Sequence, residues 1–256
     1  MLKTNFRVGK IKIFNMKKLF TILTVVALAT TTSFAQFGIK AALNLANIVN
    51  NNDDSDNGMK LGLIFGANYN AELSDAMSLD VSATYKQSGT KETSESSSSY
   101  GGVTSSVESS QTISLDYLDI SPSLSFNLSD AMALSFGPYL AFAVGGKAKY
   151  EITQTISGTG TSQDGSTTQS EEESIDFGDG DDDDGIKAMD FGLNIGATYS
   201  INDAISINAG YSMGLTNLIY VDSDMEDYYD SINEDVPSIK NMGINVGVTY
   251  SFGGGY

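Results

Sequence analysis

The residues of this chain best suited to chemistry are carboxylates, and the acidic run EEESIDFGDGDDDDG comes closest to a known ligand pattern. Four aspartates have the spacing of positions 1, 3, 5 and 12 of a Ca²⁺-binding loop: Asp179, Asp181, Asp183 and Asp190. Oxygen ligands at this spacing suit Ca²⁺, but that loop also needs a glycine at position 6, where Asp184 stands, and a glutamate at position 12. A solvated polyacidic loop is therefore the simpler interpretation, with a Ca²⁺ site as the alternative and no other cofactor indicated.

A second group of charges lies in segments that are otherwise apolar or small. Its members are Lys40, Asp80, Lys86, Asp116, Asp119 and Asp190. They fall on the weakly polar side of alternating segments, so they are expected to point into the interior of a narrow barrel. Because buried charges usually pair, we expect a lysine–aspartate network that fills this interior. The alternative is a path for small solutes or protons.

Several kinds of chemistry lack the residues they need. The chain has no histidine and no cysteine, which removes the usual general base, the commonest transition-metal ligand and thiol chemistry. Residues 36–256 carry 8 basic against 32 acidic residues, a balance that disfavours nucleic acid as a partner. We therefore expect neither an enzyme nor a nucleic-acid-binding protein.

The N-terminal part is predicted to be a targeting segment. MKKLFTILTVVALATTTSFAQ, at 16–36, has a basic start, an apolar run and a small-residue cleavage site that ends at Ala35. The apolar run is too short to anchor the chain in a bilayer. We expect a leader or misassigned start at 1–15, a signal peptide at 16–35 and one domain at 36–256.

The elements that must position the charges are strands, because the rest of the chain alternates with period two. In MSLDVSATYK, at 77–86, the apolar residues take the odd positions and the polar ones the even positions. Eight such segments begin near 37, 61, 77, 112, 132, 189, 205 and 242, and most have ten or more residues, as tilted membrane strands require. The phase changes near Asp116–Leu118, where a β-bulge is predicted.

The connections between these segments alternate between short and long. Three near-identical heptads, LSDAMSL, LSDAMAL and INDAISI, contain polar pairs that suit hairpin turns. The long connections, at about 48–58, 88–111, 146–186 and 217–239, include Ser/Thr/Gly-rich stretches that are expected to be mobile and exposed. This pattern predicts an all-β fold: an eight-stranded antiparallel transmembrane β-barrel in the outer membrane, with short periplasmic turns and long extracellular loops.

Several strands resemble those of one known family. FGIKAALNLANI, FGPYLAFAVGGKAKY, FGLNIGATY and the closing MGINVGVTYSF are similar, in order, to strands of the PorT-like outer-membrane β-barrel family of Bacteroidetes. The resemblance implies the barrel, its location and, from the family's founding member, an accessory role in secretion. The residues themselves favour a structural or interaction role through acidic external loops, without catalysis. The secretion role and, as a less favoured reading, a narrow small-solute channel are the alternatives.

The predicted partners follow from this location. They are outer-membrane lipid, proteins that meet the external loops, and the barrel-insertion machinery. The resemblance implies that this machinery recognises an aromatic residue at the end of the last strand, and either Phe252 or Tyr256 could be that residue.

Overall fold

The computed structural model describes residues 37–50, 58–158, 164–178, 185–221, 223–232 and 234–252. All of them belong to one compact unit, Ala35–Tyr256. The predicted leader, the predicted signal peptide and Tyr256 lie outside the described residues.

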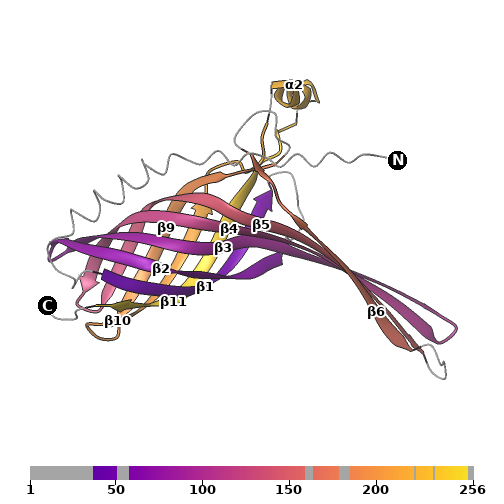
Figure 1. The fold of residues 1–256 in the computed structure, drawn as a ribbon, viewed down its shortest axis with the longest axis horizontal. Helices are drawn as coiled ribbons and strands as arrows, with labels where there is room; N and C mark the ends of the chain where they lie inside the picture. Colours follow the sequence, from indigo (N-terminus) through magenta and orange to yellow (C-terminus); the bar gives the residue numbers. More distant parts are fainter. Residues whose placement is uncertain are drawn as a thin grey trace, which may run out of the picture. The chain divides into compact units, whose positions relative to one another are not determined.

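Eight antiparallel strands form a closed ring (Figure 1). They are β1 Phe37–Asn50, β2 Gly58–Ser74, β3 Met77–Tyr100, β4 Val103–Ser129, β5 Met132–Gly158, β9 Met189–Ser200, β10 Ile205–Gly214 and β11 Ile239–Ser251. Neighbours in sequence are neighbours in the ring, and the pairing of β1 with β11 joins its first strand to its last. The predicted eight-stranded antiparallel barrel is confirmed.

The two faces of the ring differ in residue type. Large apolar side chains point outward, and in β2 the residues Leu61, Leu63 and Phe65 are each more than half exposed. The alternate positions, which face inward, are small or polar, as Gly62 and Gly66 are in the same strand. An apolar exterior around a polar interior is the arrangement of a barrel that stands in lipid.

The three repeated heptads form the turns at one end of the ring. Two-residue turns at 75–76 and 130–131 join β2 to β3 and β4 to β5. In the third turn the side-chain oxygen of Asn202 accepts hydrogen bonds from the backbone amides of Ala204 and Ile205, both at 2.9 Å. Ser129 likewise accepts from the Ala131 amide at 3.3 Å, and this side-chain capping suits the short polar residue at the second position of the heptad.

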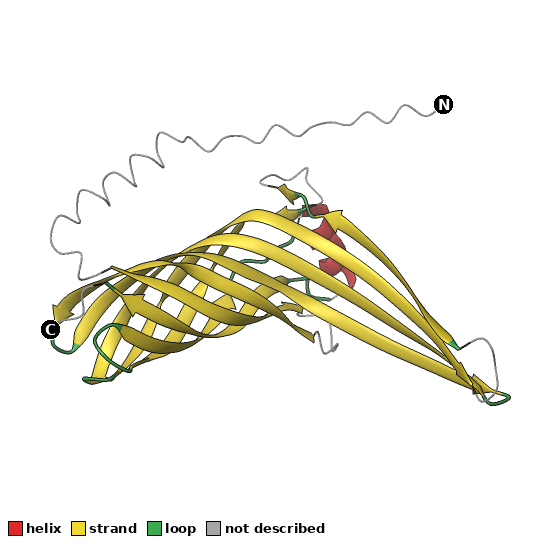
Figure 2. Ribbon diagram, turned by 60° about the horizontal axis from the view of Figure 1, so that its bottom comes forward, coloured by secondary structure: helices red, strands yellow, loops and turns green. Residues whose placement is uncertain are grey.

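Much of two predicted long loops, at about 88–111 and 146–186, is instead strand among the residues that the structure describes. β3, β4 and β5 continue past the ring, and β6, Gly165–Ser174, adds to β5 as a fourth strand (Figure 2). We call this extension, made of residues 91–100, 103–114, 147–158 and 165–174, the blade. The strands leave the ring already paired and in register, so continuing the ladder adds hydrogen bonds at little cost in loop-closure entropy. The expectation of irregular loops here is corrected, while the exposure of these segments is as predicted and their mobility stays a prediction.

The irregularity predicted near Asp116 lies in the neighbouring strand. Asp116 pairs with Gly145 and Tyr117 pairs with Ala143, so the extra residue is Val144 of β5. The alternation of inward- and outward-facing residues therefore continues unchanged along β4. Tyr117 and Asp119 both face the interior, where they are buried. Asp116 consequently faces the outside of the barrel.

The end of the ring opposite the turns is covered by residues 175–178, 185–188 and 215–221, which we call the covering segment. β7, Phe177–Gly178, pairs with β8, Ile186–Lys187, and Ile186 also bridges to Ile219. The helix α2, Ser223–Ile232, follows this covering segment. No helix among the described residues is both long and apolar enough to span a membrane.

Candidate functional site in the barrel interior

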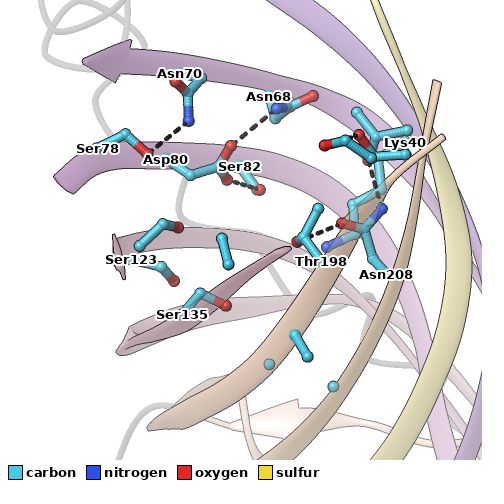
Figure 3. A pocket seen from close by; sticks show the side chains of 18 of the residues that line it. Lys40, Asn68, Asn70, Ser78, Asp80, Ser82, Ser123, Ser135, Thr198 and Asn208 are labelled. Carbon is cyan, nitrogen blue, oxygen red and sulfur yellow. Dashed lines mark hydrogen bonds between the residues drawn. The ribbon is translucent and has the colours of Figure 1, made fainter. Parts of the chain in front are cut away.

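A polar cavity of about 1090 Å³ occupies the half of the barrel that lies on the side of the turns. Hydroxyl, amide and carboxylate groups from every part of the ring line it (Figure 3). Asp80 is held there by Asn68, whose Nδ2 donates at 2.8 Å, and by the Ser82 hydroxyl at 2.9 Å. Across the cavity, Thr198 donates to Asn208 at 2.9 Å. These internal hydrogen bonds keep the polar lining in defined positions.

Negative charge dominates the cavity lining. Six carboxylate side chains line it: Glu72, Asp75, Asp80, Asp119, Asp130 and Asp203. The basic residues in the lining are Lys40 and Lys86. Asp75, Asp130 and Asp203 belong to the three turns, so the cavity reaches the turn end of the barrel. The sequence repeat thus places one carboxylate from each turn at the opening.

On the side of the cavity that faces away from the turns, a layer of hydrogen-bonded side chains crosses the barrel. The Tyr139 hydroxyl donates to Asp190 Oδ2 at 2.9 Å, and Asn241 Nδ2 donates to the same oxygen at 2.9 Å. Asn241 also donates to the Tyr117 hydroxyl at 3.1 Å and accepts from the Ser88 hydroxyl at 2.9 Å. All five side chains are buried. We call Ser88, Tyr117, Tyr139, Asp190 and Asn241 the seal layer.

Two glycines leave the space into which the Tyr139 side chain extends, and one lysine lies against its ring. A methyl group on Gly192 would overlap the Tyr139 ring, and one on Gly214 would lie 3.3 Å from its hydroxyl oxygen. The missing side chains on these neighbouring strands therefore leave the space that the phenol fills. On the cavity side, Lys86 places its Nζ 4.6 Å from the centre of the same ring, at the distance of a cation–π contact.

An apolar cluster covers the outer side of the seal layer. Ile48, Leu115 and Leu218 are buried in it, and Ile175 and Phe177 pack against it. Leu218 comes from the covering segment, where its carbonyl accepts from the Lys187 amide at 2.7 Å and its amide donates to the Ile239 carbonyl at 2.9 Å. The interior is therefore closed on this side by two layers, one polar and one apolar.

The predicted interior charges are only partly brought together. Lys40 and Asp80 line the cavity, Asp119 and Lys86 lie at its upper end, and Asp190 lies in the seal layer. The ion pairs found among the described residues are both on the blade, so the expected lysine–aspartate pairs are replaced by bonds to neutral partners. Asp119, for example, accepts from Ser121. 

Asp116 is not part of this interior group. It lies on the outer face of β4, where Gln87 Nε2 donates to its carboxylate at 3.4 Å. The inward-facing residues of this part of β4 are Leu115, Tyr117 and Asp119, so Asp116, between them, points outward.

The residues proposed for Ca²⁺ do not form one described site. Asp179, Asp181 and Asp183 lie outside the described residues. Asp190 is 2% exposed and belongs to the barrel interior. Within the parts of the chain that the structure describes, no three acidic side chains converge as metal ligands would.

Sequence reasoning missed most of the seal layer. Ser88 and Asn241 are ordinary polar residues of the inward face, and nothing in their local sequence sets them apart. The available signal was Tyr139 itself, because it is a large aromatic residue at an alternating position otherwise filled by small ones. Its partners depend on which strands lie opposite one another, which alternation alone does not give.

The blade has two different faces, because directly paired residues point to the same side of a sheet. One face, which we call the hydroxyl face, carries cross-strand hydroxyl pairs such as Thr153 with Thr168, at 3.0 Å, and Thr155 with Ser166, at 3.2 Å. The other, which we call the apolar face, carries Tyr100, Val103, Val107, Tyr150, Ile152 and Ile156. On this face Ile152 is 51% exposed.

A closed antiparallel ring with an apolar exterior and a polar interior defines a transmembrane β-barrel. The chain belongs to the outer membrane protein beta-barrel domain family, whose model matches residues 29–220. Its location is the outer membrane. No curated protein matches the chain.

Several solved structures are similar to this barrel. Ail, the attachment invasion locus protein of Yersinia pestis, solved with the heparin analogue sucrose octasulfate, is 12% identical, with 85% of this chain and 97% of that chain covered and a TM-score of 0.36. Neisserial surface protein A is 14% identical, with 86% and 98% covered and a TM-score of 0.35. CarO of Acinetobacter baumannii is 11% identical, with 83% and 97% covered and a TM-score of 0.30.

Proposed function

We propose that this outer-membrane barrel has an interaction role, exerted through its acidic extracellular part, and that it catalyses no reaction. The observation that carries the proposal is the alternation of β5 in the blade. In KAKYEITQTIS, at 147–157, apolar side chains, interrupted once by Gln154, alternate with charged and hydroxyl ones, the pattern of a strand with one covered face. Yet Tyr150 and Ile152 on that face are 44% and 51% exposed, which supports a partner that covers them.

The charge of the blade indicates what kind of surface this partner has. Lys91, Lys147 and Lys149 are outnumbered by glutamates, which are Glu92, Glu95, Glu108, Glu151, Glu171, Glu172 and Glu173. An acidic sheet with an apolar stripe fits a protein surface that is basic around an apolar centre. We therefore propose a protein partner of this kind, bound on the apolar face.

The strand edges of the blade are less suited to binding. β6 is paired on one side only, and three successive glutamates, 171–173, lie along it. Charged residues on an edge strand discourage pairing with further strands. The interaction is accordingly assigned to the face of the blade and not to its edges.

The absence of cysteine from the chain allows a sharp test. Ser109 and Ser110 are adjacent, but Ser109 pairs with Ile152 on the apolar face and Ser110 pairs with Glu151 on the hydroxyl face. A photo-crosslinker is attached to Ser109→Cys or Ser110→Cys in the full-length protein in cells. We expect one defined crosslinked protein from Ser109→Cys only, lost when Ile152→Ser is added, with a basic surface once it is identified.

Two results would overturn the proposal. Equal crosslinking from both faces, or crosslinking that survives Ile152→Ser, would remove the apolar face as the binding surface. Crosslinks to secretion components from a cysteine placed in a periplasmic turn, with none from Ser109→Cys, would instead support the accessory role in secretion.

A further inference from the structure

We propose that the barrel interior is a one-sided chamber, which concentrates small cations from the periplasm and is sealed against the outside of the cell. This inference is independent of the blade and of its partner. It rests on the cavity of about 1090 Å³, the charges that line it and the layer that closes it.

The chamber opens toward the periplasm. Residues of all three turns line it, and in outer-membrane barrels the short turns are on the periplasmic side. Six carboxylates against two ammonium groups give its lining an excess of negative charge. Because the barrel is surrounded by lipid of low dielectric constant, this charge acts strongly on the enclosed water and raises the local concentration of cations. Anions are correspondingly depleted.

The seal layer ends the chamber on the other side. β4 and β11 stand opposite each other in the ring, so the hydrogen bond of 3.1 Å from Asn241 to Tyr117 runs across the interior. Tyr139 fills the space over Gly192, and Asp190 joins it to Asn241. At this level the interior holds hydrogen-bonded side chains, with the apolar cluster around Leu218 directly outside.

Lys86 places a positive charge at the inner surface of this seal. It is 7% exposed and lines the chamber, and among the described residues its ammonium group forms neither a hydrogen bond nor an ion pair. This charge lies near the Asp190 carboxylate of the seal layer, which partly balances it. Cations therefore enter the chamber, and the barrier they meet at its end is the closely packed side chains of the seal.

The chamber can be probed with cysteine reagents, since the protein has no cysteine of its own. Ser123 lines the cavity and is labelled in Figure 3. Ser157 is exposed on the blade, is paired with Thr104 and does not line the cavity. The Asp164 carboxylate accepts from the neighbouring Gly158 amide at 2.9 Å, so Ser157 is a conservative control position that already has one negative charge nearby. The rates of modification by a trimethylammonium and by a sulfonate methanethiosulfonate are measured on the folded full-length variants Ser123→Cys and Ser157→Cys.

We expect the ratio of cationic to anionic rate to be at least about tenfold higher at Ser123→Cys than at Ser157→Cys. Adding Asp80→Asn and Asp119→Asn should bring the two ratios closer together. Equal ratios at the two positions, or faster modification by the sulfonate in the cavity, would overturn the cation-concentrating chamber. Heat-modifiable electrophoretic mobility verifies that each variant is folded.

The seal is tested separately by conductance in planar bilayers. The variant that combines Tyr139→Ala with Leu218→Ala removes a large side chain from each closing layer. The control combines Leu218→Ala with Tyr199→Ala, because Tyr199 faces outward and is 53% exposed. We expect cation-selective steps from the first variant and none from the control or the unchanged protein. Anion-selective steps, or a folded first variant without steps, would contradict the proposal.

Discussion

Asn241 and Tyr117 are joined by a hydrogen bond of 3.1 Å between the amide nitrogen and the phenol oxygen, although their strands are four apart in either direction around the ring. The two residues are 124 positions apart in sequence. Asn241 uses both amide hydrogens and its oxygen, for Asp190, Tyr117 and Ser88. It is therefore the residue through which the opposite sides of the barrel are connected.

Replacing Asn241 by alanine is expected to destabilise the barrel by about 1–3 kcal/mol, because Tyr117, Ser88 and Asp190 would all lose a buried partner. Urea-dependent folding into lipid vesicles measures the change. Asn70→Ala is the matched control, since Asn70 is half-buried and makes one bond of 3.2 Å to Ser78. A loss of stability no larger than that of the control would show that the crossing bonds contribute little.

Gly192 is predicted to be required for the position of Tyr139. In Gly192→Ala the added methyl group would overlap both the Tyr139 ring and the Met213 carbonyl, so the ring must move. We expect a loss of about 1–3 kcal/mol in the same unfolding measurement. Gly165→Ala is the control, because a methyl group there meets nothing within 4 Å. Pairing Gly192→Ala with Tyr139→Ala should recover part of the loss, and full additivity would count against this explanation.

The architecture could be predicted from the sequence because it follows from local signals. Period-two alternation identifies strands, and the three heptads identify turns, so strand number, pairing and location all follow. Lys40 and Asp80 were placed in the interior by the same rule, since each occupies an inward position of its strand. Alternation therefore carries information about which face a residue occupies.

Alternation carries no information about what lies across the ring. The seal layer depends on side chains from β3, β4, β5, β9 and β11 meeting in the interior, and this follows from the stagger of the closed barrel. Asp116 was misplaced because the extra residue was assigned to β4, whereas Val144 in β5 carries it. The blade was missed because Ser/Thr-rich composition suggests a mobile loop, while its order comes from strands already paired below it.

The acidic run is predicted to lack a saturable Ca²⁺ site. Asp190, which would be position 12 of the loop, instead accepts hydrogen bonds from Tyr139 and Asn241 inside the barrel. Asp190 cannot bind Ca²⁺ together with the loop aspartates while it is held inside the barrel. The remaining carboxylates are an incomplete ligand set, which binds divalent cations only diffusely. Isothermal titration of the folded protein with Ca²⁺ should show no saturable heat. A single-site isotherm that Asp190→Asn abolishes would refute this expectation.

The pairing of β6 with β5 is predicted to weaken in acid. The hydrogen bond of 2.7 Å from Lys147, together with its charge, lowers the pKa of Glu172 below the usual glutamate value, and it raises the pKa of Lys147. A carboxylate with a lowered pKa in the folded state stabilises at neutral pH, and this contribution is lost as the pH falls through that pKa. Because the pair is exposed, the effect should be small and confined to the blade.

Amide hydrogen exchange across β6 measures this weakening. Protection of the β6 amides should fall as the pH is lowered through the acidic range, after correction for the intrinsic exchange rate, while the barrel strands remain protected. Glu172→Gln should remove most of this pH dependence. Glu171→Gln is the control, because Glu171 is on the apolar face and is in neither of the two ion pairs among the described residues. An identical response from both variants would mean that the ion pair with Lys147 does not hold β6 in place.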